Sequence, residues 1–352
     1  RTLPGPGPRI AGLRNLSALQ SPGIAADGPA GHSAVVPRAI HSIAEAVSSA
    51  NRPGVQEKPG AGILAWIFCL RSTHWEYVGR PAVYSLEESL RSLGISVAVA
   101  FLEQKQLLLR SLTKSIKRGY RPIVIILSWH RSGDETALIA VRQAVRRGAY
   151  LIVYNTEPAP LRMQQVVPFA VAFRASEIWS YSRGVESQYA HLAENLTNLT
   201  LRYVPPGCAS KLDLRVNASS PKRDEAHLGF VGLWANRNRG MRRALERHDQ
   251  LRINKYIITP AQWREVLEQW PVQFNMHSLW NEIGGLETLR MAQLLTSGAC
   301  VFSETCHPLD EEEFNGMVHF GTPQELLDTF NESYKDNHEA IQTCQRQSHA
   351  LF

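Results

Sequence analysis

The sequence of 352 residues predicts an α/β protein with two doubly wound parallel units that face each other across a cleft. Three observations predict this class. From about residue 61, short apolar runs of strand length alternate with amphipathic helical stretches. A polar stretch without a clear period, 208–226, interrupts the series and is typical of a linker. A second alternating series then follows, so each part is expected to form a parallel sheet with helices on both faces.

The alternating pattern does not extend to the first part of the chain. Residues 1–60 are rich in Pro, Gly, Ala and Ser and show almost no periodicity. We expect them to form a poorly ordered leader or targeting remnant outside the fold. The expected domains are therefore an N-terminal unit at 61–207 and a C-terminal unit at 208–352.

The first unit begins with the apolar run 63–70, which predicts a strand. The stretch 82–94 predicts a helix that Gly94 closes. Helix 134–148 has acids in its first turn and arginines in its last, as the helix dipole favours. The remaining elements expected in this unit are strands 95–101, 121–128, 150–155, 177–182 and 201–207 and helices 103–119, 159–173 and 183–193.

The second unit begins with the strand 227–233, "HLGFVGL". A long helix from about 323 is expected to end the chain. Between them we expect strands 253–258, 272–277 and 299–304 and helices 238–249, 260–269 and 286–297.

Composition excludes several classes of protein. The longest apolar runs are only strand-sized, and a bilayer-spanning helix needs roughly 20 residues. The five cysteines are odd in number and include no C-x-x-C pair, so we expect neither a disulfide framework nor a structural zinc site. Cys69 and Cys300 lie in predicted strands, where cysteine usually behaves as a small hydrophobic residue.

The net charge of +6 is unevenly distributed. Segment Lys105–Arg147 has ten Lys or Arg against two acids, a net +8, which leaves −2 for the rest. One interpretation is solvated helix faces; the other is peripheral contact with an anionic membrane or acceptor. Nucleic acid is not expected, because no aromatic residues are interleaved to stack on bases. We expect a soluble or peripheral protein, with a cytoplasmic location favoured over secretion.

Polar side chains and glycines gather where strands of the second unit end. Ligands of open α/β sheets bind at the carboxyl ends of strands, where strand order switches. The residues expected there are Gly232, Arg237, Arg239, His277, Gly284, Gly285, Glu287, Ser303 and Glu304.

These residue types suit a diphosphate flanked by sugars. A helix that begins near Gly285 offers N–H groups to a phosphate, and Gly284 and Gly285 allow its close approach. Arg237 and Arg239 can neutralise the same diphosphate. Glu287 can accept hydrogen bonds from sugar hydroxyls, so a nucleotide-sugar is the expected ligand.

Several segments together resemble a known family. They are "EIWSYS", "VPPG", "FVGLWANRNR", "FNMH" and a segment in which Leu286, Glu287, Arg290, Leu294, Leu295, Val301, Ser303 and Glu304 match "LE-x-x-R-x-x-x-LL-x-x-x-x-x-V-x-SE". Because of these five segments, residues 61–350 resemble GT-B glycosyltransferases of the bacterial group-1-like type. The resemblance implies a C-terminal Rossmann-like domain that holds the nucleotide-sugar and an N-terminal one that holds an acceptor of unknown identity. It places Arg290 and Ser303 in the donor site.

The sequence also departs from this family. Many GT-B enzymes have a ribose-binding Glu where this chain has Gln293, and a partner Glu where it has Gly285. Gln293 remains a candidate for the donor site. Glu287 and Glu304 either have a role related to that of the missing glutamate pair or have no role in binding the donor. There is no Asp-x-Asp motif, which is consistent with metal-independent transfer that needs no cofactor.

The catalytic candidates are Glu304, Glu157 and His277, and the acceptor-side candidates are Trp129 and His130. Glu157 leaves a strand of the first unit, but it is equally a turn residue before a proline. His277 ends an apolar strand and is equally a core histidine with satisfied hydrogen bonds.

Structural interpretations exist for the other candidates as well. Glu287 and Arg290 are three residues apart and can form a surface ion pair. Arg237 and Arg239 can be solvated residues at a helix start. The acidic run 310–313 is expected to be a solvated loop. At the level of function, the alternatives to a sugar-transfer enzyme are a non-catalytic GT-B scaffold that binds nucleotide or glycan, and a different two-domain α/β binder such as a sugar-nucleotide epimerase.

Overall fold

The computed structural model describes residues 63–69, 79–101, 105–127, 135–156, 160–187, 199–214, 226–232, 234, 237, 242, 245–254, 259–277 and 285–352. The predicted leader, 1–60, lies outside the described residues.

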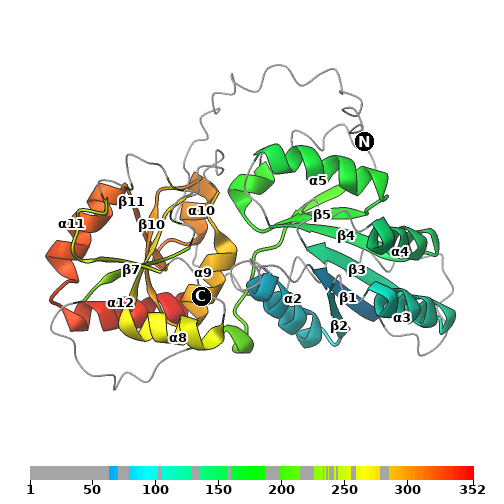
Figure 1. Ribbon diagram of the computed structural model, residues 1–352, viewed down its shortest axis with the longest axis horizontal. Coiled ribbons are helices and arrows are strands. Elements are labelled where there is room, and N and C mark those ends of the chain that lie inside the picture. The colour runs from blue at the N-terminus through cyan, green and yellow to red at the C-terminus, as the bar shows by residue number, and fades with distance from the viewer. Residues whose placement is uncertain are drawn as a thin grey trace, which may run out of the picture. The chain divides into compact units, whose positions relative to one another are not determined.

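The first sheet has six parallel strands in the order β2-β1-β3-β4-β5-β6 (Figure 1). Its strands are β1 (Ile63–Cys69), β2 (Ser96–Phe101), β3 (Arg121–Leu127), β4 (Tyr150–Asn155), β5 (Glu177–Ser180) and β6 (Thr200–Tyr203). The helices between them are α2 (Arg80–Ser92), α3 (Lys105–Lys117), α4 (Glu135–Arg146) and α5 (Pro160–Ala172).

Both faces of this sheet are buried. Ile123 and Ile125 of β3 pack into a core that includes residues of α2. Val124 and Ile126 point to the opposite face and pack into a core that includes residues of α3, α4 and α5. Since successive strand residues alternate between faces, a continuous apolar run such as that of β3 requires helices on both sides.

The second sheet has five parallel strands in the order β11-β10-β9-β7-β8. They are β7 (Leu228–Val231), β8 (Leu251–Asn254), β9 (Val272–Asn275), β10 (Cys300–Glu304) and β11 (Val318–Gly321). The helices are α8 (Pro260–Gln269), α9 (Thr288–Thr296), α10 (Pro308–Glu313), α11 (Pro323–Ser333) and α12 (His338–Leu351), and the 3₁₀ turn η3 (Ser210–Leu212) precedes the sheet. Strand order reverses between β7 and β9, which is where an open α/β sheet binds its ligands.

The second sheet is also covered on both faces. Phe230 and Phe274 pack with residues of α11 and α12, whereas Val231 and Val301 pack with residues of α8 and α9. Helices α8 and α11 each begin with a capping box, in which the threonine before the helix and the Gln or Glu three residues later satisfy each other's backbone N–H. The Thr-Pro-x-Gln/Glu sequences thus define where these two helices start.

The predicted fold class, α/β with two doubly wound parallel units, is confirmed. The terminal helix is not continuous, because α11 ends at Ser333 and a new helix, α12, is capped by the Asn337 side chain, which accepts from the Ala340 N–H at 3.0 Å. The short elements α10 and β11 were not expected from the sequence. Strand β8 begins two residues earlier than predicted. Half of the predicted helix 238–249 lies outside the described residues, and residues 246–249 are not helical.

Two cysteines give a further correction. Cys300 of β10 and Cys344 of α12 form a disulfide, although the sequence predicted no disulfide framework. They are 44 positions apart in the sequence, so only the packing of α12 against β10 brings them together. Cys208 and Cys306 are not part of this disulfide.

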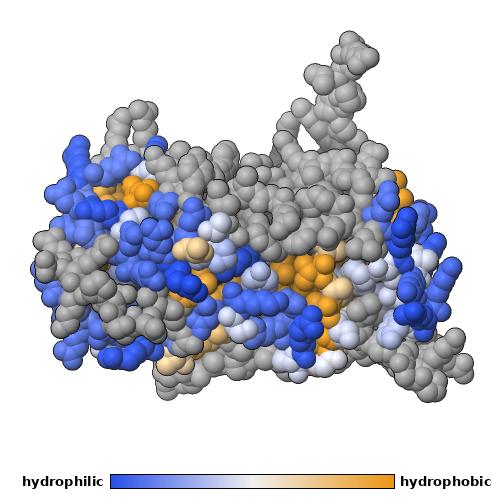
Figure 2. Space-filling view, turned by 60° about the horizontal axis from the view of Figure 1, so that its bottom comes forward, coloured by the Kyte–Doolittle hydropathy of each residue, from blue (hydrophilic) through white to orange (hydrophobic). Residues whose placement is uncertain are grey.

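The basic segment forms an exposed face on neighbouring helices α3 and α4. Its exposed residues include Arg110, Lys114, Lys117, Arg118, Arg142, Arg146 and Arg147. The face shown in Figure 2 has hydrophilic residues over much of its described surface, with apolar residues in smaller patches. Among the described residues, no helix is both long and apolar enough to cross a membrane. Contact of the basic face with an anionic partner stays a prediction.

Candidate functional site

A cluster of charged residues lies at the carboxyl ends of β7, β9 and β10, beside the strand-order switch. β9 ends at Asn275 and leads directly to His277, and β10 ends at Glu304. Glu287 stands at the N-cap of α9. Parallel pairing of β9 with β10 brings these strand ends together from separate parts of the sequence.

Glu287 and His277 form the centre of the cluster. The Oε2 atom of Glu287 lies 2.9 Å from Nδ1 of His277 and accepts a hydrogen bond from Nδ2 of Asn275 at 3.0 Å. Asn275 Nδ2 also donates to the Ser303 hydroxyl oxygen at 3.0 Å. Although Glu287 is the N-cap residue of α9, its side chain makes no capping hydrogen bond, and it precedes the helix that was predicted to begin at residue 286.

The hydrogen bonds of His277 require a protonated ring. Its Nδ1 faces the Glu287 carboxylate, and its Nε2 lies 3.1 Å from the carbonyl oxygen of Thr305. Because both partners accept hydrogen bonds, both ring nitrogens must carry protons. Burial lowers the pKa of His277, but the charge and hydrogen bond of Glu287 outweigh it and raise the pKa to about 9.

The same ion pair lowers the pKa of Glu287. Burial raises the pKa of Glu287, but the neighbouring His277, Arg237 and Arg290 outweigh burial and lower it to about 2. Glu287 is therefore ionised and His277 is cationic at neutral pH. A surface ion pair with Arg290 does not account for Glu287, since only 18% of its side chain is exposed and it pairs with His277.

Glu304 completes the cluster from the end of β10. Its Oε2 accepts a hydrogen bond from the backbone N–H of His277 at 2.7 Å. Burial raises the pKa of Glu304 more than this hydrogen bond and His277 lower it. This hydrogen bond fixes the chain where it leaves β9. Glu304 is half-buried, so part of its surface stays accessible.

Two arginines stack on one aromatic ring. The guanidinium carbons of Arg237 and Arg290 lie 5.3 and 5.5 Å from the ring centroid of Phe230. Gly232, directly after β7, has φ +144°, and a Cβ atom there would lie 3.0 Å from Arg290 Nη2. Glycine at this position therefore supports a turn that few other residues adopt and leaves room for the Arg290 side chain.

Arg237 is the most unusual charge of the site. It is only 5% exposed, so it is not the solvated helix-start residue that the sequence allowed. Burial, followed by the charge of Arg290, lowers its pKa to about 10, and it remains charged at neutral pH. Its Nε atom has no hydrogen-bond partner among the described residues, and neither has Oδ1 of Asn275.

The described part of the cluster has a net positive charge. Arg237, Arg290 and His277 supply three positive charges, and Glu287 and Glu304 supply two negative charges when ionised. Buried polar groups without partners are rare in proteins and indicate bound water, ions or ligands. The cluster is therefore suited to an anionic ligand that carries hydrogen-bond acceptors.

Gly285 has a different role from the one the sequence suggested. A Cβ atom at this position would lie 2.8 Å from Cγ2 of Val185 and 2.9 Å from Oγ of Ser182. The next backbone N–H, that of Leu286, donates to Oδ2 of Asp310 at 3.1 Å. Gly285 thus permits close packing of the protein on itself, and its space is not available to a phosphate.

The acidic run 310–313 is not a solvated loop, which corrects the sequence analysis. Asp310 is fully buried on α10, and its carboxylate accepts hydrogen bonds from the Ser182 hydroxyl at 2.7 Å and from the Arg183 N–H at 2.8 Å. Glu313 pairs with Nε of Arg183 at 2.9 Å. These acids join the start of α9 to segment 182–184, a connection that depends on residues more than 120 positions apart.

Gln293 and Ser303 are structural in their observed contacts. The Gln293 amide donates to the carbonyl oxygen of Leu212 at 3.0 Å, in the turn η3 that precedes the second sheet. The role of Gln293 in ribose binding stays a prediction. The Ser303 hydroxyl lies between Asn275 and the backbone carbonyl of Glu304, so it positions the β9 and β10 ends.

Five of the predicted residues lie outside the described residues. They are the catalytic candidate Glu157, the acceptor-side candidates Trp129 and His130, and the donor-site candidates Arg239 and Gly284. Their roles stay predictions.

Comparison with known proteins gives similarity of structure only. No protein-family model and no curated protein sequence matches the chain. One solved structure similar to it is an α,α-trehalose 6-phosphate synthase from Burkholderia multivorans, with a TM-score of 0.48 and 9% identity, over 82% of this chain and 94% of that chain. Another is a UDP-forming α,α-trehalose-phosphate synthase from Burkholderia xenovorans, with a TM-score of 0.41 and 10% identity, over 71% and 74%.

Proposed function

We propose that the chain is a metal-independent glycosyltransferase that moves a sugar from a nucleotide-sugar donor to an acceptor hydroxyl. The proposed donor site is the cluster of Arg237, His277, Glu287, Arg290 and Glu304 at the carboxyl ends of β7, β9 and β10. The observation that carries the proposal is the buried Arg237, whose Nε has no partner among the described residues and whose pKa is lowered by burial and by the like charge of Arg290.

A buried guanidinium is costly unless an anion compensates it. Arg237 and Arg290 share one aromatic ring, so their like charges add to that cost. A diphosphate supplies two negative groups with several acceptor oxygens and suits two guanidinium groups well. Its binding would offset the repulsion and satisfy the Nε atom of Arg237.

The same groups can promote bond cleavage. When an acceptor hydroxyl displaces the donor diphosphate at the anomeric carbon, negative charge develops on the leaving oxygen. Arg237 and Arg290 would stabilise this charge, and protonated His277 would add a third positive charge from the β9 exit. Positive side chains would thus take the place that a divalent metal has in other sugar-transfer sites.

The pKa values favour a different role for each of the candidate residues His277, Glu287 and Glu304. His277, with a pKa of about 9, is protonated near pH 7 and cannot be the general base there. Glu287, with a pKa of about 2, is a weak base and acts by holding His277. Glu304 has a raised pKa and is half-buried, so it is the carboxylate that we assign to a sugar hydroxyl.

A second candidate function is a GT-B scaffold that binds nucleotide or glycan without turnover. The ion pair between Glu287 and His277 favours this function, because it occupies one of the two carboxylates of the described cluster. Glu304 is then the remaining carboxylate that could take part in a reaction. Both functions use the same anion site, so binding alone does not separate them.

Calorimetric titration with UDP, GDP and ADP tests the anion site. Arg237→Ala should weaken binding of the preferred nucleotide by about 10- to 100-fold, because a hydrogen bond to a charged group contributes about 1.5–3 kcal/mol. The matched control is Arg264→Ala, which removes an exposed arginine of α8 and should leave affinity unchanged. Equal affinities in wild type and Arg237→Ala would refute the site.

Release of free nucleotide from a panel of UDP-, GDP- and ADP-sugars separates enzyme from scaffold. Slow hydrolysis of one donor, retained in EDTA, is expected for the metal-independent enzyme. Binding of a donor without release supports the scaffold. Loss of turnover in EDTA that Mn²⁺ or Mg²⁺ restores would refute metal independence.

A further inference from the structure

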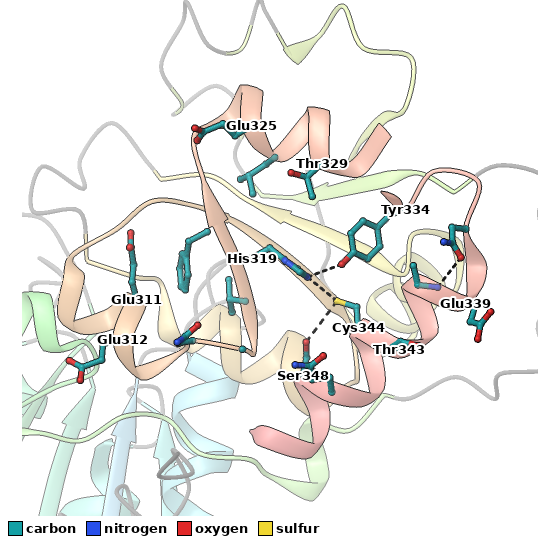
Figure 3. A pocket seen from close by; sticks show the side chains of 18 of the residues that line it. Glu311, Glu312, His319, Glu325, Thr329, Tyr334, Glu339, Thr343, Cys344 and Ser348 are labelled. Carbon is teal, nitrogen blue, oxygen red and sulfur yellow. Dashed lines mark hydrogen bonds between the residues drawn. The ribbon is translucent and has the colours of Figure 1, made fainter. Parts of the chain in front are cut away.

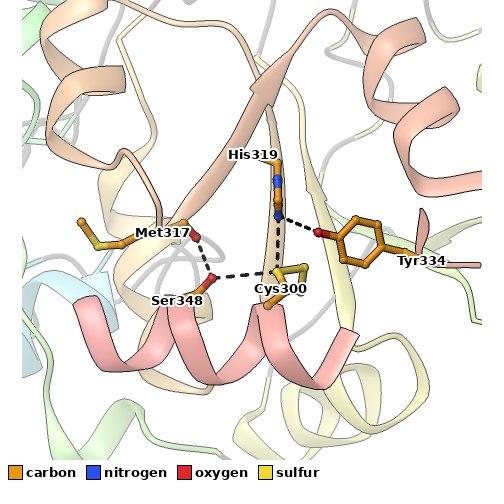
Figure 4. The surroundings of a disulfide bond; sticks show 6 residues. Cys300, Met317, His319, Tyr334 and Ser348 are labelled. Carbon is orange, nitrogen blue, oxygen red and sulfur yellow. Dashed lines mark hydrogen bonds between the residues drawn. A yellow bond between two sulfur atoms is a disulfide. The ribbon is translucent and has the colours of Figure 1, made fainter. Parts of the chain in front are cut away.

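A separate cluster of potential metal ligands lies at the other side of the second unit, around the disulfide. Cys300 is at the start of β10, Cys344 is on α12 and His319 is on the edge strand β11 (Figure 4). One ligand atom from each residue, two sulfurs and a ring nitrogen, lies within 4.8 Å of the others. None of the three belongs to the proposed donor site.

The His319 ring is held in one orientation. It stacks on Phe302 of the neighbouring strand with ring centroids 4.8 Å apart, in the register that pairs these two residues. Its Nε2 atom lies 3.1 Å from the Tyr334 hydroxyl and 3.5 Å from Sγ of Cys344. A nitrogen ligand is therefore already directed at the sulfur pair.

The cluster borders a large hollow. The hollow has a volume of about 1020 Å³ and is formed by residues of α10, β11, α11 and α12 (Figure 3). His319, Tyr334, Cys344 and Ser348 are part of its wall. A small ligand can therefore reach Cys344 from the solvent.

The charge of the hollow favours a cation. Its described lining includes Glu311, Glu312, Glu325 and Glu339 and no lysine or arginine. Three of these acids, Glu312, Glu325 and Glu339, are exposed at the surface. Carboxylates of one sign that line a concave surface raise the local concentration of cations.

We propose that reduction of the Cys300–Cys344 disulfide converts this cluster into a zinc site. The ligands are the two cysteine sulfurs and Nε2 of His319, and the fourth position is open to the hollow for water or a small ligand. Zn²⁺ with two thiolates and one imidazole is a known tetrahedral ligand set. The chain would thus hold β10 to α12 by a covalent bond when oxidised and by a metal when reduced.

The distances suit this coordination. With Zn–S of about 2.3 Å and Zn–N of about 2.0–2.1 Å, tetrahedral geometry puts nitrogen and sulfur roughly 3.6 Å apart. Nε2 of His319 and Sγ of Cys344 are already 3.5 Å apart. The two sulfurs must separate to about 3.8 Å once they are no longer bonded. Cys344 is buried but lines the hollow, so the separation of the sulfurs is expected to move its side chain toward that space.

A dithiol can reduce the Cys300–Cys344 disulfide by two successive thiol–disulfide exchanges. One of its thiolates attacks Sγ of Cys344, and Cys300 leaves as a thiolate that takes up a proton. The second thiol of the reductant attacks the mixed disulfide, releases the Cys344 thiol and leaves as a cyclic disulfide. Zn²⁺ then binds both sulfurs and displaces their two protons, while the Tyr334 hydroxyl gives up its contact with Nε2 of His319.

The test measures metal bound to the full chain in its two redox states. The protein is oxidised, or reduced with a phosphine that carries no thiol, and dialysed against Zn²⁺ alone. The reduced protein is expected to bind one zinc per chain tightly, and the oxidised protein none at this site. Co²⁺ in place of zinc should give the absorption bands of a tetrahedral thiolate site only after reduction.

Variants assign the ligands without removing the disulfide. His319→Gln should lower zinc affinity of the reduced protein by at least about 100-fold, because loss of even an outer-shell partner of a ligand costs 10- to 100-fold. Cys208→Ser removes a thiol outside the cluster and should bind zinc like the wild type. Circular dichroism must show a folded reduced protein in each case.

Four outcomes would overturn the proposal. Three of them are equal zinc binding in both redox states, unchanged affinity in His319→Gln, and no binding by a folded reduced wild type. Zinc binding that Cys208→Ser removes would assign the metal to other residues and would overturn it as well.

Discussion

Substitution of Glu287 by glutamine tests the ion pair at the centre of the proposed donor site. Glutamine keeps the size of the side chain and removes its charge, so it leaves Nδ1 of His277 without an anionic partner. His277 has a pKa of about 9 in the folded chain, whereas an unperturbed histidine has a pKa of 6.5. At 1.36 kcal/mol per pKa unit, this difference corresponds to about 3 kcal/mol of stability. The pKa of Glu287, lowered to about 2, reflects the same interaction together with the charges of Arg237 and Arg290, so it is not added to this figure.

The pH dependence has a definite sign. Because the folded-state pKa of His277 lies above its unfolded value, its stabilisation is fully present below about pH 6.5 and is lost as pH rises through about 9. Because the pKa of Glu287 is lowered, its contribution is present above about pH 4.5 and is lost as pH falls through about 2. The pair therefore stabilises the fold most between about pH 4.5 and 6.5.

Urea unfolding of wild type and Glu287→Gln at pH 6.5 and pH 9 measures this effect. At pH 6.5 the variant should be less stable by about 3 kcal/mol, and the difference should become smaller at pH 9, where half of the His277 rings have lost their charge. The control Glu268→Gln removes an exposed carboxylate of α8 and should follow the wild type at both pH values. A variant that is as stable as the wild type at pH 6.5 would refute the ion pair. A loss of only about 0.3–1 kcal/mol at both pH values would instead indicate a helix-dipole effect.

Three further substitutions test neighbouring features. Glu304→Gln should reduce single-turnover sugar transfer by about 10-fold or more with little change in thermal melting, since the glutamine oxygen can still accept the N–H hydrogen bond; wild-type kinetics would exclude a role in the reaction. Asp310→Asn should lower the free energy of unfolding by about 2–4 kcal/mol, because a buried carboxylate loses charged hydrogen bonds, whereas the exposed control Asp328→Asn should have no such effect in urea unfolding. Gly285→Ala should cost about 1–3 kcal/mol, because its Cβ overlaps two side chains of segment 182–185; a neutral result in the same assay would show that this segment can move aside.

The local order of the fold was predictable from the sequence. The run 121–128 is apolar without interruption, and the structure has β3 there with both faces buried. Continuous apolar runs of strand length separated by amphipathic helices are compatible with few arrangements other than parallel sheets. The elements that were missed, β11 and α10, are only four and six residues long, and segments that short carry little periodic signal.

The location of the candidate site also followed from the sequence. Residues at the carboxyl ends of parallel strands meet at one edge of a sheet, so Arg237, His277 and Glu304 were expected together before their distances were known. Their types, cations beside carboxylates, already indicated an anionic ligand with hydroxyl groups. Spacing along the chain could not indicate which of these groups pair with each other.

Pairing, burial and protonation were decided by tertiary structure alone. Glu287 faces His277 and Asn275 rather than its own helix, which makes His277 a cation and removes it as a base. Asp310, expected in solvent, is buried because segment 182–184 supplies N–H and hydroxyl donors from the other half of the chain. Cys300 and Cys344 meet only because α12 packs on β10. Each of these properties depends on the distance between groups far apart in sequence, and local residue patterns carry no information about such distances.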